Sequence, residues 1–183
     1  LHLVMGVDIP SVLKESASRQ AKSLVKVFEQ EGFQNVSGEG EYNAEAESSA
    51  KYLMHLDFAS PSDLQRALEI IRADYSQLQV YQQEDRRLSL RYTDFYLQNL
   101  TSRTMDQAIE TIRNRIDEFG VAEPSITAQG DDRILIQLPG VEDAANAKAL
   151  INRTAKLDFM LVETPEFDLV AKVEEVEQKG GYS

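Results

Sequence analysis

The chain has 183 residues and a net charge of −12, because 31 Asp and Glu outnumber 19 Lys and Arg. This balance argues against a nucleic-acid-binding protein, since binding a polyanion relies on Lys and Arg to neutralise phosphates. With no Cys and only two His, thiol catalysis, disulfides, thiolate metal sites and an imidazole-rich zinc site are excluded. No apolar run approaches the roughly 18 residues that cross a bilayer, and 42% hydrophobic residues suffice for a core.

The first elements along the chain are a strand and a long helix. Residues 1–7 form an apolar run typical of a strand, and Asp8 and Pro10 introduce a helical pattern that ends at Gly32. One face of this helix is predicted to be buried: Leu13, Ala17, Ala21, Leu24 and Phe28.

The next segment predicts two further strands and a second helix. A weak strand near Val36 leads into a loose, polar connection over residues 39–50. Within residues 52–58, Tyr52, Met54, Leu56 and Phe58 alternate with Leu53, His55 and Asp57, as in a strand with one buried face. Residues 60–75 begin with an N-cap serine and a first-turn proline and predict a helix, which a short strand at residues 78–81 follows.

The second half repeats this order of elements. Residues 88–92 predict a strand, and the helix that follows ends at Gly120. Its predicted buried stripe is Met105, Ala108, Ile109, Ile112, Ile116 and Phe119. Residues 125–129 and 133–138 flank a Gly-Asp-Asp turn and predict a hairpin.

The last predicted elements are a helix and a strand. Acidic residues at 142 and 143 favour a helix start. The inner face of this helix is predicted to be Ala144, Ala147, Leu150 and Ile151. Leu157, Phe159 and Leu161 alternate as in a strand.

Each half therefore has the order strand, helix, strand, strand, helix, strand of a split β-α-β, ferredoxin-like unit. We predict an α+β fold of two such units, which share antiparallel sheet surfaces and have helices packed on one face. The predicted units are residues 1–84 and 85–163, and residues 164–183 are expected to begin a truncated further subdomain or a linker.

Few single residues indicate chemistry, and no catalytic, cofactor-binding or metal-binding residue is predicted. His55 faces the same way as Leu53 and Asp57. We interpret it as a surface or edge histidine without a role, and a proton-responsive group is the alternative. The acid pairs at residues 45 and 47 and at 131–132 lack the spacing of calcium ligands, so turn-forming and solvating roles are favoured.

Arg113 and Arg115 lie on the polar side of the second long helix, near Asp117 and Glu118. Ion pairs on the helix surface account for both arginines. A docking surface is the alternative.

The ferredoxin-like order suggests three classes of function. An RNA-recognition module needs an aromatic motif and a basic surface, and neither is found. A small phosphatase needs a glycine-rich anion loop, but residues 7–11 contain no glycine and carry Asp8. A small-molecule-binding regulatory module stays open as an alternative.

The chain contains the segments RNRIDEFGVAEP at 113–124 and QGDDRILIQLPG at 129–140, with AKALI at 147–151 leading into AKLDFMLV at 155–162. In this order, these linked segments closely resemble the SecD family of the bacterial protein-export machinery. The first residues, LHLVMGVD at 1–8, look like the stretch that leaves the first transmembrane helix in that family. The resemblance extends to about residue 163.

This resemblance implies a non-enzymatic part of a membrane complex without cofactors. SecD and its partner SecF assist translocation of unfolded exported polypeptides through the SecYEG channel, using the proton gradient. The first periplasmic domain of SecD has a ferredoxin-like base and a head that contacts the client. The chain resembles the base with only the start of the head, an extracytoplasmic piece of an inner-membrane protein.

Three expectations follow from the resemblance. Gly140 and the junction at Thr164 and Pro165 are possible hinges between base and head. Since the segment that returns from head to base is missing, a strand edge is expected to stay unpaired, which favours concentration-dependent self-association. The base itself could also hold an unfolded segment by edge-strand addition.

Overall fold

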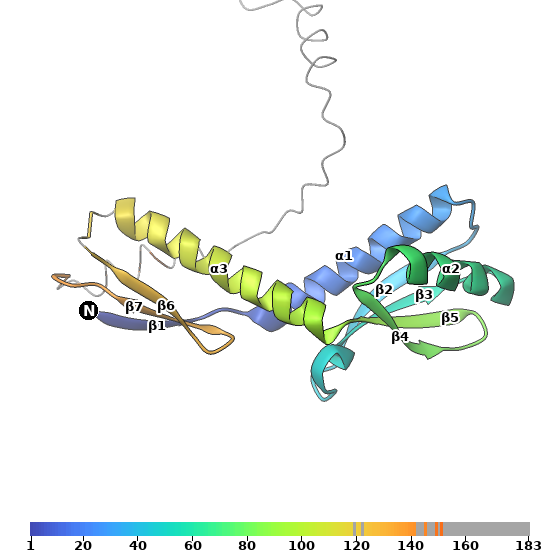
Figure 1. Cartoon of the computed structure of the whole chain (residues 1–183), viewed down its shortest axis with the longest axis horizontal. Helices are drawn as coiled ribbons and strands as arrows, with labels where there is room; N and C mark the ends of the chain where they lie inside the picture. The colour runs from blue at the N-terminus through green and yellow to red at the C-terminus, as the bar shows by residue number, and fades with distance from the viewer. Residues whose placement is uncertain (119, 122, 142–144, 146–148, 150, 152–183) are drawn as a thin grey trace, which may run out of the picture. The chain divides into compact units, whose positions relative to one another are not determined.

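The computed structural model describes residues 1–118, 120–121, 123–141, 145, 149 and 151 (Figure 1). The elements in chain order are β1 (His2–Gly6), α1 (Ile9–Gln30), β2 (Ser37–Tyr42), the short 3₁₀ helix η1 (Ser48–Lys51), β3 (Tyr52–Asp57), α2 (Pro61–Asp74), β4 (Leu78–Gln83), β5 (Arg87–Tyr92), α3 (Asp94–Glu118), β6 (Ser125–Gln129) and β7 (Arg133–Gln137). The predicted strand at 157–161 and residues 164–183 lie outside the described residues.

The strands form two antiparallel sheets, so the α+β class and the antiparallel pairing are confirmed. One sheet has four strands in the order β2-β3-β5-β4, and the other has three in the order β1-β7-β6. Helices α1 and α2 lie over the same face of the four-stranded sheet, and α3 runs along the three-stranded sheet (Figure 1).

Two strands lie in a different sheet from the one we predicted. We placed residues 88–92 in the second half, but β5 pairs with β3 and β4. We placed residues 1–7 in the first half, but β1 pairs with β7. The three-residue connection between β4 and β5, in which the Glu84 N–H donates to the Arg87 carbonyl at 2.8 Å, closes a hairpin, and short connections favour pairing between neighbours.

The arrangement is therefore nested. Elements β1, α3, β6 and β7 follow the strand, helix, strand, strand order of a ferredoxin-like unit, and residues 9–92 are inserted between β1 and α3. The inserted unit starts with a helix, and its last strand, β5, takes the central place that the first strand usually holds. Of the helix predicted to start at residues 142 and 143, Ala145, Ala149 and Ile151 are helical.

Helix α1 has the predicted buried face, Leu13, Ala17, Ala21, Leu24 and Phe28, with Ile9 added. The Asp8 side chain caps its start by accepting hydrogen bonds from the Ser11 N–H at 3.2 Å and the Ser11 hydroxyl at 2.7 Å. Near its end, the ring of Phe28 packs against Phe33 and Phe58, with centroids 5.1 and 5.6 Å away. This aromatic cluster anchors α1 to the four-stranded sheet.

Strand β2 was predicted only as a weak strand near Val36 followed by a loose connection. It instead pairs with β3 over Ser37–Tyr42. Glycine and glutamate are poor strand formers, which hid the strand. The glycines serve close packing: a Cβ on Gly40 would lie 2.8 Å from the Ser18 Cα, and one on Gly38 would lie 2.7 Å from a Val25 methyl.

Helix α3 connects the two sheets. It packs against β6 and also contacts α1 and η1. Of its predicted stripe, Met105, Ala108, Ile112 and Ile116 are buried, Ile109 is partly buried, and Phe119 lies outside the described residues. Within the part of the chain that the structure describes, no helix is long and apolar enough to cross a membrane.

The predicted hairpin of β6 and β7 is confirmed. Gly130 begins its turn with a φ of 72°, a backbone conformation that favours glycine. Ile126, Ile134 and Ile136 of the hairpin are buried. At the end of β1, the Val7 N–H donates to the Asp132 carbonyl of the turn at 2.7 Å, which ties the first strand to this hairpin.

Candidate functional site

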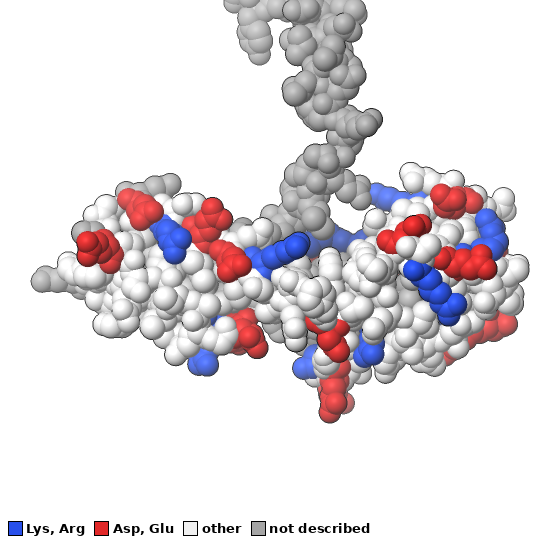
Figure 2. Space-filling model, in the orientation of Figure 1, with Lys and Arg blue, Asp and Glu red and all other residues white. Residues whose placement is uncertain are grey.

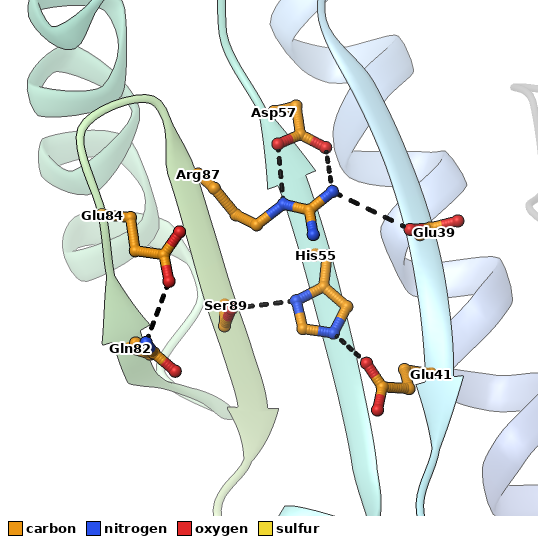
Figure 3. A network of polar contacts seen from close by, with 8 residues as sticks. All are labelled: Glu39, Glu41, His55, Asp57, Gln82, Glu84, Arg87 and Ser89. Carbon is orange, nitrogen blue, oxygen red and sulfur yellow. Dashed lines mark hydrogen bonds and ion pairs between the residues drawn. The ribbon is translucent and has the colours of Figure 1, made fainter.

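The outer face of the four-stranded sheet, turned away from α1 and α2, carries a network of polar side chains (Figure 3). Strand β3 alternates, so that Met54 and Leu56 are fully buried in the core while His55 and Asp57 lie on the outer face. The register places His55 opposite Glu39 of β2 and Ser89 of β5. Three neighbouring strands thus contribute to one polar row.

His55 lies at the centre of this row. Its Nδ1 is 2.9 Å from the Ser89 hydroxyl, and its Nε2 is 2.7 Å from a carboxylate oxygen of Glu41. Only 9% of the residue is exposed, and β3 is an inner strand. His55 is therefore not a surface or edge histidine, as we interpreted it. It is buried on an inner strand, between side chains of β2 and β5 that contact both of its ring nitrogens.

Arg87 and Asp57 form a two-bond ion pair beside His55. The Arg87 Nε and Nη2 each donate to a different Asp57 oxygen at 2.8 Å, and Nη2 is 4.0 Å from Glu39. The hydrogen bonds from Arg87 lower the pKa of Asp57, and the same bonds raise the pKa of Arg87. Both groups are therefore charged at neutral pH and fix the edge of the row.

The Ser89, His55 and Glu41 contacts resemble the order of a nucleophile, a base and a carboxylate. Ser89, however, is only 5% exposed in the middle of the sheet. Strand β5 is paired on both sides, by β3 and β4, so its backbone N–H groups are taken up by the two ladders and cannot stabilise an oxyanion. The row is a cross-strand network that holds three strands in register.

A groove of about 900 Å³ forms the second feature, where the start of α1, η1, α3 and the β6–β7 turn meet. The Ser48 hydroxyl donates to Asp94 at 2.8 Å across the contact between η1 and α3, and this bond lowers the pKa of Asp94. Charged residues line the groove: Lys51, Asp94, Asp106, Asp131, Asp132 and Arg133. The groove marks where supporting elements of both sheets touch.

The predicted hinge residues are only partly described. Gly140 is exposed and has a φ of 72°, a conformation that a residue with a side chain rarely adopts. Thr164 and Pro165 lie outside the described residues. The hinge role stays a prediction.

The predicted docking residues lie on α3, away from the polar row. Arg113 is exposed and Arg115 is partly buried. Among the described side chains neither forms an ion pair with Asp117, and the side chain of Glu118 is outside that set. Figure 2 shows acidic and basic side chains interspersed on the visible face.

The sequence did not point to Glu41, Ser89 and Arg87 as partners of the row. Alternation within a strand shows which side chains leave the core, but it does not show which strands are neighbours. The nested pairing of β5 with β3 is what brings Ser89 to His55 and Arg87 to Asp57. These partners could have been identified only from the order of the strands in the sheet, which the sequence pattern does not give.

Comparison with known proteins assigns residues 105–164 to the family described as "Protein translocase subunit SecDF, P1 domain, N-terminal". A protein translocase subunit SecD from Desulfurispirillum indicum is 46% identical over 93 residues, which cover 51% of this chain and 18% of that protein. SecD subunits from Magnetococcus marinus and Syntrophobacter fumaroxidans are 33% and 32% identical, and each match covers 88% of this chain and 30% of the relative. The chain thus spans less than a third of the length of these relatives. No solved structure matches.

Proposed function

The matched residues of this chain belong to the SecD family, and we propose that the chain is a non-catalytic, extracytoplasmic base that couples membrane helices to a client-contacting head during protein translocation. The match of residues 105–164 to the N-terminal part of the P1 domain carries this proposal. The cell would place such a base on the periplasmic side of the inner membrane. SecF, the SecYEG channel and the exported polypeptide would be its partners, and the proton gradient would drive it.

The contacts of α3 support a mechanical role. This helix packs against β6 at one sheet and contacts η1 and α1 at the other. Packed helices and sheets move as units, because their interdigitated side chains resist continuous deformation. A 25-residue helix that touches both sheets can therefore pass a displacement from one to the other.

The polar row supports a structural role as well. Its nucleophile-like serine is buried in a fully paired strand, and its charged residues are bonded to one another. We infer that the row keeps the inserted unit rigid, because its cross-strand contacts prevent β2, β3 and β5 from sliding past one another.

The test uses a reversible lock in the full-length protein. A pair of cysteines would be introduced across the junction between base and head, one near Gly140 and one in the head. Export should slow when the disulfide forms and recover on reduction, while each single cysteine leaves export unchanged. Equal export in the oxidised and reduced protein would refute the coupling role.

The groove of about 900 Å³ favours one alternative, a ferredoxin-like module that binds a small-molecule regulator. A ligand that binds the folded state raises the melting temperature with its concentration. The alternative predicts such a rise with a metabolite, and its loss in Asp94→Asn. The base proposal predicts no rise.

A further inference from the structure

Strand β4 is an open and uncharged edge of the four-stranded sheet. Within the described part of the chain it pairs only with β5. Its sequence, LQVYQQ, has no charged residue, and Val80 and Tyr81 are 39% and 49% exposed. Edge strands are usually protected by charges or proline. The opposite edge, β2, carries Glu39 and Glu41, so the two edges of this sheet differ.

The backbone of Val80 points toward the open edge. The Thr93 N–H donates to the Gln77 carbonyl at 2.9 Å, which makes these two residues a hydrogen-bonded pair. Pairs alternate in an antiparallel ladder, so Gln79 and Arg91 form the next bonded pair. The N–H and carbonyl of Val80 therefore face away from β5. A register shift after Val80 ends the regular part of the edge.

A groove of about 420 Å³ lies beside this edge, between β4 and the C-terminal end of α2. Ile71, Tyr75 and Val80 supply its apolar wall, and Arg72 is its charged residue. Val80 pairs with Leu90, which is fully buried, so the groove lies on the helix-covered side of the sheet. A strand added to β4 would direct every second side chain toward this groove.

We propose that β4 and this groove bind an extended polypeptide segment by strand addition, with an apolar side chain in the groove and basic residues at the ends. The proposal rests on the proposed function, because an unfolded exported polypeptide would be the occupant. Charge favours a basic segment, because the chain carries a net charge of −12. Glu84 and Asp85 follow the strand directly and would attract a basic end, although Arg86 comes next and Arg72 lines the groove.

The test measures peptide binding to the 183-residue chain by fluorescence anisotropy. The probe is a synthetic peptide with alternating Val and Thr in its centre and two Lys at each end. Val80→Pro removes the outward N–H without removing a ladder bond and should weaken binding about tenfold or more. Val80→Thr keeps the N–H and the β-branched shape and should bind within about threefold of the parent. Melting curves would show that both variants are folded.

Two further probes separate main-chain pairing from charge. A peptide with N-methyl groups along its pairing edge should not bind, and a peptide with Glu in place of Lys should bind more weakly. Equal binding to the parent and a folded Val80→Pro would overturn the proposal, as would no saturable binding of the first peptide. A dimer that Val80→Pro dissolves would also overturn it, since the edge would then serve a second copy. Each of these failures leaves the reversible lock, and with it the proposed function, separately testable.

Discussion

The four-stranded and three-stranded sheets differ in how far their strands lie apart along the chain. All four strands of the larger sheet come from Ser37–Tyr92, one continuous stretch. The smaller sheet pairs β1 with β7, and the Leu1 amino group donates to the Leu138 carbonyl at 2.9 Å. The larger sheet can therefore close on local contacts, whereas the smaller one needs the whole inserted unit to bring its strands together.

The sheets also differ in how their faces and edges are held. The larger sheet has two helices on one face and the polar row on the other. The smaller sheet is packed against α3, and within the described residues β1 pairs with β7 alone and leaves Val4 57% exposed. In a ferredoxin-like unit the place beside the first strand belongs to the fourth, which we predicted at residues 157–161. The inserted unit is thus the self-sufficient part.

The largest expected effect is a loss of stability when the aromatic cluster of the inserted unit is disrupted. Phe28→Ala removes a fully buried ring that contacts Phe33 and Phe58 and should lower the free energy of unfolding by about 4 kcal/mol. Phe95→Ala is the matched control, because Phe95 is 78% exposed, and should change it by less than about 0.5 kcal/mol. Urea unfolding followed by circular dichroism measures both. A similar loss for the two variants would contradict the cluster's role.

A smaller effect is expected where α1 touches β2. Gly40→Ala would place its Cβ 2.8 Å from the Ser18 Cα, and backbone cannot move aside easily. We expect a loss of about 2 kcal/mol. Gly38→Ala meets mainly side-chain methyls of Val25 and Leu56, which can rotate, and should cost less. The reverse order in thermal melts would show that α1 does not lie this close to β2.

The outer edge of β1, where the described residues place no partner, predicts self-association unless residues 157–161 pair there. The chain should form larger species as its concentration rises, and Val4→Lys should weaken the association about tenfold, or about 1.4 kcal/mol, by adding a charge to the edge strand. Thr127→Lys, on the other edge of the same sheet, serves as the control and should have little effect. Sedimentation velocity measures both, and a strictly monomeric parent chain across a wide concentration range would contradict the prediction.

The smallest expected effect concerns the ion pairs of the two sheets. Arg87 lowers the pKa of Asp57, so this carboxylate adds stability above its unfolded pKa, near 3.9, and the added stability is lost as pH falls through the lower folded value. Because both side chains are more than 40% exposed, Asp57→Asn should cost at most about 1 kcal/mol at pH 7. Asp132→Asn removes only a 3.7 Å contact to Arg133 and should cost less.

Unfolding at several pH values checks this prediction. The difference between the parent chain and Asp57→Asn should begin to shrink below about pH 4, where the carboxyl of the unfolded chain becomes protonated, and should vanish only once the pH has fallen through the lower folded pKa. A difference that stays constant down to pH 2 would show that Asp57 contributes through packing and not through charge.

The elements with strong periodicity could be predicted from the sequence. Helices α1 and α2 have clear apolar faces with a cap at each start, and in β3 the core residues Met54 and Leu56 alternate with His55 and Asp57. Strand β2 was hidden because its glycines serve a close approach by α1, a tertiary requirement that strand propensity does not include.

Strand pairing could not be predicted in the same way. The local pattern of each segment predicts that β1 and β5 are strands. It does not predict that β1 pairs with the distant β7 and that β5 pairs with β3. The polar row depended on that pairing, so His55 could be placed on the outer face while its bonds to Ser89 and Glu41 could not be foreseen.

The most direct test of α3 as the connector between the two sheets is the export rate of the full-length protein with a softened helix. Gln107 and Glu110 are exposed on α3, so Gln107→Gly with Glu110→Gly should loosen the helix by about 1 kcal/mol per position and leave its buried face intact. We predict that this double variant slows export several-fold, while Gln107→Ala with Glu110→Ala exports at the parent rate. Equal rates for the glycine and alanine variants would contradict the coupling role of α3.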